Sequence, residues 1–127
     1  MKGCDMNRVL FIAGVLGATG VAAGAFGAHA LETSVTPERL AVWETAAQYH
    51  LIHAVVMVAL AARTNSAGAL ERVAAVGFTL GVVLFSFSLY ALVLTDISRL
   101  AMITPIGGLL LMLSWGLLAV QALKGKG

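Results

Sequence analysis

Charge is scarce in this chain, and cysteine is almost absent. Only 11% of the 127 residues are charged, whereas 60% are hydrophobic, and the mean hydropathy is +0.95. A chain of this composition cannot cover a water-soluble surface with polar groups, so a soluble globular fold is excluded. The one cysteine permits no internal disulfide.

Catalytic motifs are also lacking. The sequence contains neither H-E-x-x-H nor paired C-x-x-C, and no Ser-His-acid set, phosphate-binding loop or carboxylate pair can be assigned. These absences leave enzymatic activity uncertain and favour a protein that is not an enzyme.

Four long apolar stretches fill most of the chain. A helix that crosses the bilayer core needs about 20 apolar residues, and each stretch is near that length. They cover residues 9–31, 46–62, 73–94 and 100–123. The sequence therefore predicts an all-α integral membrane four-helix bundle, with residues 1–127 forming a single four-span domain.

The distribution of Lys and Arg predicts the orientation. With four spans, both termini lie on the same side as the loop between spans two and three. That side carries six basic residues: Lys2, Arg8, Arg63, Arg72, Lys124 and Lys126. The other side carries Arg39 and Arg99 only. Since cytoplasmic loops collect Lys and Arg, we expect both termini in the cytoplasm of a bacterial inner membrane. The isoelectric point of about 9.0 then reflects orientation charge rather than nucleic-acid binding.

The first apolar stretch has some features of a signal peptide. Lys2 and Arg8 precede it, and Ala28-His29-Ala30 imitates a cleavage site. A stretch of about 20 residues is longer than the 7–15 of a signal h-region. We therefore expect it to be a membrane span.

Glycines indicate how the helices pack. At about 100° per residue, five glycines of span one fall within roughly 140° of one another: Gly14, Gly17, Gly20, Gly24 and Gly27. Span three carries Gly77 and Gly81, and Pro105 is followed by Gly107 and Gly108 in span four. Because glycine lets a neighbouring backbone approach closely, we expect tight contacts by spans one and three within the bundle, with self-association as the alternative use of these faces.

Two Thr-Pro pairs mark helix starts. Thr36-Pro37 is typical of an N-cap and a first helical residue, so span two begins well before its apolar stretch. Its first turns would stand at the interface, with Trp43 as the anchor. Thr104-Pro105 either begins span four after a short helix from Ser98 or kinks a longer helix.

Polar residues of the spans gather toward the half opposite the termini. This candidate cluster consists of His29, Tyr49, His53, Ser86, Ser88, Tyr90 and Thr104. Polar groups in lipid are costly, so they should face the bundle interior or the interface. His50 and His53 are three residues apart and could share a metal with His29, ligate haem or pass protons. The alternative is that these side chains hydrogen-bond across helices and hold the bundle in register.

Several segments resemble a known family. Gly24-Ala25-Phe26-Gly27-Ala28-His29 is similar to a hallmark of the YgdD/YwdK-like family of small bacterial membrane proteins, which has a mitochondrial relative. Tyr49-His50-Leu51-Ile52-His53, Phe85-Ser86-Phe87-Ser88-Leu89-Tyr90 and Thr104-Pro105-Ile106-Gly107-Gly108 fit the family in order. The resemblance implies four helices, an inner-membrane location and no established activity. It leads us to expect glutamine at position 50 and a small residue at position 87, where this chain has His50 and Phe87.

The sequence therefore predicts an accessory component of a larger membrane complex, or a lipid or quinone binder. A small oligomeric transporter or channel is the alternative, and a metal or haem protein that uses His29 and His53 is a lesser one. Membrane lipid, a larger complex or a homo-oligomer are the expected partners, and the cofactor stays unknown.

Overall fold

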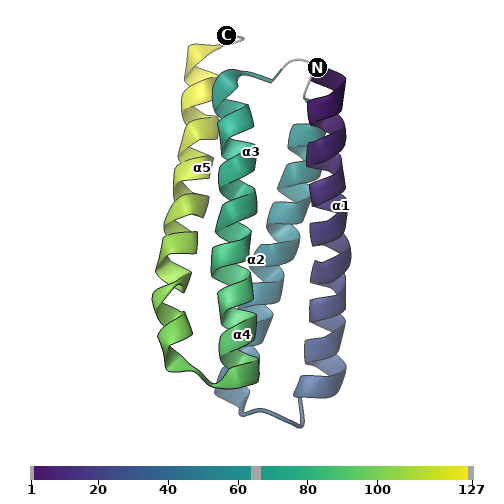
Figure 1. The fold of residues 1–127 in the computed structure, drawn as a ribbon, viewed down its shortest axis with the longest axis vertical. Helices are drawn as coiled ribbons and strands as arrows, with labels where there is room; N and C mark the ends of the chain where they lie inside the picture. Colours follow the sequence, from purple (N-terminus) through teal and green to yellow (C-terminus); the bar gives the residue numbers. More distant parts are fainter. Residues whose placement is uncertain (1, 64–66, 126–127) are drawn as a thin grey trace.

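The computed structural model describes residues 2–63 and 67–125, and these residues form helices joined by short loops, with no strand among them. Each long rod in Figure 1 is one helix or a series of helical segments. The segments are α1 (Lys2–Phe26), η1 (Gly27–Leu31), α2 (Pro37–Ala62), α3 (Ala69–Val82), η2 (Val83–Phe87), α4 (Ser88–Thr95), η3 (Ser98–Met102) and α5 (Thr104–Lys124). The turns η1 and η2 are π-helical and η3 is a 3₁₀-helix.

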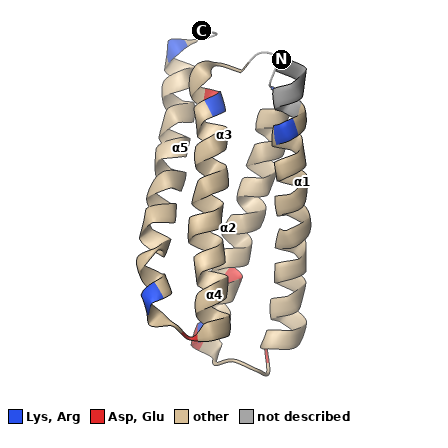
Figure 2. Cartoon of the chain, in the orientation of Figure 1, with Lys and Arg blue, Asp and Glu red and all other residues tan. Residues whose placement is uncertain are grey.

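The segments form four rods that are long and apolar enough to cross a membrane, which confirms the predicted fold class. They cover Asn7–Leu31, Pro37–Ala62, Ala69–Thr95 and Ser98–Lys124. Their charges lie near the two ends, and the middle of the bundle is almost free of charge (Figure 2). The beginning of α1 and the end of α5 lie at the same end of the bundle (Figure 1).

The two Thr-Pro pairs begin their helices differently. Thr36 is the N-cap of α2, and its hydroxyl accepts a hydrogen bond from the backbone N–H of Arg39 at 3.2 Å, as the sequence predicted. The N-cap of α5 is instead Ile103, so Thr104 is already helical and makes no cap. Its side chain is free to contact another helix. The short 3₁₀-helix from Ser98 precedes this start, which is the first of the two predicted arrangements.

The helix α2 is central to the arrangement. It packs against α1 on one side and against α3, η2 and α4 on the other, whereas α5 packs chiefly on α3 and η2. The main core lies where α1, α2 and α3 meet and includes Leu16, Met57 and Phe78. The helices α1 and α5 are therefore the edges of the bundle, and 17% of the apolar window of each is buried, against 44% in α2.

Glycines bring α5 into close contact with the third rod, which consists of α3, η2 and α4. A Cβ added to Gly107 would collide with the backbone of Leu84 and Phe85, and one added to Gly77 would collide with the Ser114 hydroxyl. At Gly81 the nearest backbone atom to the Cβ position is the carbonyl oxygen of Gly107, at 3.2 Å. The two backbones approach so closely that no side chain fits between them at these positions.

The glycine face of α1 is divided between two uses. Gly20 faces Leu51 of α2, and Gly27 faces Trp43. At Gly14, Gly17 and Gly24 a Cβ would have no described atom within 4 Å. Among the described residues, the close contacts of this face are thus with α2, and three of the five glycines make none.

Trp43 differs from the expected interfacial anchor. Its side chain is buried, and its indole N–H donates to the carbonyl of Ala23 at 2.7 Å. Its ring lies 4.5 Å from that of Tyr90 and 5.5 Å from that of Phe26, measured between centroids. The absence of a side chain at Gly27 makes room for the indole, so Trp43 of α2 contacts both α1 and α4 inside the bundle.

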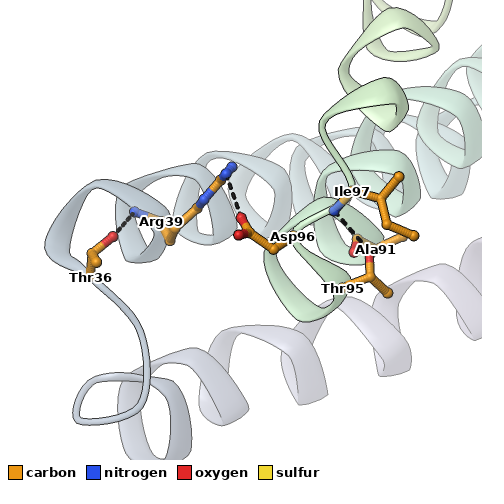
Figure 3. A network of polar contacts seen from close by, with 6 residues as sticks. All are labelled: Thr36, Arg39, Ala91, Thr95, Asp96 and Ile97. Carbon is orange, nitrogen blue, oxygen red and sulfur yellow. Dashed lines mark hydrogen bonds and ion pairs between the residues drawn. The ribbon is translucent and has the colours of Figure 1, made fainter.

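An ion pair closes the end of the bundle opposite the termini. Arg39 at the start of α2 donates to the carboxylate of Asp96 at 2.6 Å (Figure 3). Asp96 follows α4 in a left-handed conformation with φ of 58°, which ends that helix. Thr95 donates to the carbonyl of Ala91 and accepts from the N–H of Ile97. Because the pair is exposed, it contributes at most about 1 kcal/mol and serves mainly to fix the two loops.

Replacing Gly107 by alanine tests the contact between α5 and the third rod. The new methyl group would press on the backbone of Leu84 and Phe85, so we expect the free energy of unfolding to fall by about 1–3 kcal/mol. Gly116→Ala is the matched control, because the Cβ position of Gly116 is open among the described residues. Unfolding in mixed micelles measures both variants. Equal stability of the two would contradict the close backbone contact.

Candidate functional site

Two buried histidines lie at the centre of α2. His50 is 1% exposed and His53 is 4% exposed, so each ring must satisfy its nitrogens within the protein. They are buried because they lie on the same face of α2 as Ala46, Ala54 and Met57, and this face packs in the core. The surroundings of these two rings define the candidate site.

His50 connects three helices. Its Nε2 lies 3.0 Å from the hydroxyl of Thr19 in α1, and its Nδ1 lies 2.9 Å from the hydroxyl of Tyr90 in α4. We assign the hydroxyl proton of Thr19 to its bond with the carbonyl of Val15, at 2.8 Å, so that Thr19 accepts from His50. The proton is therefore on Nε2, and Tyr90 donates to Nδ1. This chain of bonds runs in one direction, from Tyr90 through His50 to Thr19.

His53 makes a second connection with the opposite tautomer. Its Nδ1 lies 2.7 Å from the carbonyl oxygen of Tyr49, which can only accept, so Nδ1 carries the proton. Its Nε2 then accepts from the indole N–H of Trp115 in α5 at 3.2 Å. The rings of Phe78 and Trp115 lie 5.5 and 6.0 Å from the His53 ring. Both nitrogens of this neutral ring are thus engaged, as in His50.

The two serines of the cluster contact different helices. Ser86, fully buried in η2, donates to the carbonyl of Ala46 in α2 at 2.8 Å. Ser88 donates to the carbonyl of Phe85 at 2.9 Å, so the Thr104 hydroxyl, 2.7 Å away, donates to Ser88. The third rod is in this way bonded to α2 on one side and to α5 on the other.

His29 and Tyr49 lie apart from these bonds. His29 is exposed at η1, and the structure does not bring it together with His50 and His53. Among residues 7–63 and 67–125, whose side chains the structure describes, no group of three or more His, Cys, Asp or Glu is placed to hold a metal ion. Tyr49 is 40% exposed and stacks on Phe85, with 4.8 Å between ring centroids. Its contribution to the network is its backbone carbonyl.

Three polar partners were not predicted from the sequence. Thr19 and Trp115 each provide the hydrogen bond that completes a histidine. The amide oxygen of Gln121 in α5 accepts from the N–H of Leu70 at 3.2 Å and replaces the missing cap at Gly68, where α3 begins. An indole N–H or an amide inside an apolar span requires a partner, and that requirement is the signal that marks Trp115 and Gln121.

The fold and this network define a multi-pass helical membrane protein whose buried polar side chains are hydrogen-bonded within the bundle, to backbone groups and to other side chains. A family model described as "Protein of unknown function (DUF423)" matches residues 23–108. The UPF0382 membrane protein YwdK of Bacillus subtilis is 40% identical over 92% of this chain and 98% of its own length. The UPF0382 membrane protein SSP2132 of Staphylococcus saprophyticus is 39% identical, with the same coverage.

A UPF0382 membrane protein of Haemophilus influenzae is 32% identical over 94% of this chain and 97% of its own length. The chain therefore belongs to the UPF0382 (DUF423) family of membrane proteins, which confirms the resemblance seen in the sequence. No solved structure matches the chain.

A double-mutant cycle tests the bond between α2 and α4. We expect His50→Leu and Tyr90→Phe to be coupled by about 0.6 kcal/mol, and by no more than about 1.7, the range for hydrogen bonds between membrane helices. Unfolding of the single and double variants in micelles measures the coupling. His29→Leu combined with Tyr90→Phe is the control pair and should be additive within about 0.5 kcal/mol. Additive effects of the His50 and Tyr90 changes would show that the bond contributes nothing.

Proposed function

We propose that this protein is a non-enzymatic accessory component of a larger complex in the bacterial inner membrane, with both termini in the cytoplasm. The observation that supports the proposal most is how the polar side chains are used. Both nitrogens of His50 and of His53 are engaged in bonds within the chain, so neither ring offers a free lone pair to a metal or haem iron.

The edge helix α1 provides the docking face of the proposed accessory component. Phe11, Val15 and Val21 are exposed on it, and the Cβ positions of Gly14 and Gly17 are open. A glycine face lets a second helix approach closely, and in lipid this packing is what drives helices together. We propose that one helix of a partner protein packs on this part of α1.

Mass spectrometry under native conditions tests this function on the full chain purified gently from its own membrane. We expect a stoichiometric membrane-protein partner, together with an optical spectrum free of haem bands and no stoichiometric metal. Gly17→Ile should abolish the association, because the larger side chain fills the face on which the partner helix packs. Gly116→Ile, on the open face of α5, is the matched control and should retain the partner.

Other outcomes would contradict the proposal in different ways. A haem band or a stoichiometric metal that is lost in His29→Ala and His53→Ala would make this a cofactor protein. A homo-oligomer without another subunit would favour the small transporter or channel. If Gly17→Ile retained the partner, the docking face would not lie on this part of α1.

A further inference from the structure

A groove lies between α1 and α3, at the end of the bundle where α1 begins and α5 ends. Its volume is about 340 Å³, and α2 forms its floor through Met57 and Leu60. Ile12 of α1 and Val76 of α3 lie on its two sides. Figure 1 places α2 behind α1 and α3 in this region. The volume is in the range of small-molecule sites, and the walls are apolar, as a hydrocarbon chain requires.

Two guanidinium groups belong to the same groove. Arg8 of α1 and Arg72 of α3 both line it. Arg72 donates to the carbonyl of Ala67 at 2.9 Å through Nη1, which leaves its other donors available. The Arg8 side chain is exposed. Arginine suits phosphate recognition, because its planar fork presents several donors to the phosphate oxygens.

A carboxylate oxygen in the same lining has no partner. Glu71 accepts from Arg63 at 3.1 Å through Oε1, and its side chain is 11% exposed. Its second oxygen, Oε2, is buried and has no hydrogen-bond donor among the described residues. A buried carboxylate oxygen requires a donor, and a cationic one satisfies it best.

We propose that this groove binds one phospholipid that carries an amine in its head group, of the phosphatidylethanolamine kind. One acyl chain lies along Ile12, Leu60 and Val76, the phosphate bonds to Arg8 and Arg72, and the ammonium group donates to Glu71. Charge complementarity selects this ligand, because an anionic head group without an amine would match the arginines and leave Glu71 unpaired. The groove lies at the end with the termini, where basic side chains meet the head groups of the bilayer.

The apolar wall of this lipid site and the open glycines of the proposed docking face lie on different sides of α1. Ile12 lines the groove, and Gly14, two residues further on, lies roughly 160° away around the helix at 100° per residue. Arg8 lies roughly 20° from Val15 around the helix, so the two sites meet only near the start of α1. The lipid titration below tests this site separately from the docking face.

Lipid titration of the purified full chain, followed by native mass spectrometry, tests the site. The probes are phosphatidylethanolamine and phosphatidylglycerol with identical acyl chains. We expect one phosphatidylethanolamine per chain, bound at least tenfold more weakly when Arg8→Gln and Arg72→Gln are combined. Arg99→Gln, at the opposite end of the bundle, should bind as the unchanged protein does. A loss of the same size in Arg99→Gln would show that binding follows general charge, and the proposal would fail.

Two further variants separate the head group from the acyl chain. Glu71→Gln should remove the preference for phosphatidylethanolamine over phosphatidylglycerol. Val76→Trp should block the groove and weaken both lipids, whereas Val73→Trp, equally exposed on α3 but outside the groove, should weaken neither. Helix content by circular dichroism shows that each variant is folded. Unchanged lipid binding by Val76→Trp would show that the groove is not the binding site. If Glu71→Gln kept its preference for phosphatidylethanolamine, Glu71 would not recognise the amine.

Discussion

The two buried histidine rings of α2 need hydrogen-bond partners from other helices, and this requirement governs the arrangement of the bundle. Lipid provides neither donors nor acceptors, so an imidazole in this position must find both within the protein. Thr19 and Tyr90 complete His50, and Trp115 completes His53. These bonds connect α2 to α1, α4 and α5, so α2 is held from three sides. The glycine contacts then bring the backbones close enough for the bonds to form.

Hydropathy predicted the four helices, because the cost of exposing the backbone in a bilayer leaves an apolar chain few alternatives. The cap at Thr36 was equally predictable, since a threonine before a proline specifies a helix start by local chemistry alone. Trp43 was expected as an interfacial anchor, and its ring is buried within the bundle. An indole near a helix start is common in the headgroup layer, and only the position of Gly27 in a neighbouring helix shows that a buried pocket exists for it.

Of the candidate cluster, the structure places His53, Ser86, Ser88, Tyr90 and Thr104 in hydrogen bonds between helices, whereas His29 and the Tyr49 side chain lie apart. Which nitrogen of a histidine bonds to which helix depends on rotation and register, and a sequence specifies neither. His50 shows this most clearly, because the resemblance leads us to expect glutamine there and the residue therefore looked less important. A glutamine also has one carbonyl acceptor and an N–H donor, the two functions that His50 uses toward Tyr90 and Thr19. A glutamine in this position would therefore supply the same donor and acceptor as the imidazole.

We propose that the histidines hold the helices together instead of serving a metal or a cofactor. Nitrogen NMR of the protein in a lipid disc, labelled at its histidine rings, tests this claim most directly. Our account predicts two opposite neutral tautomers, with the proton on Nε2 in His50 and on Nδ1 in His53, and no change of either signal when zinc is added. The same tautomer in both rings, or a shift of the His53 signal with zinc, would contradict it.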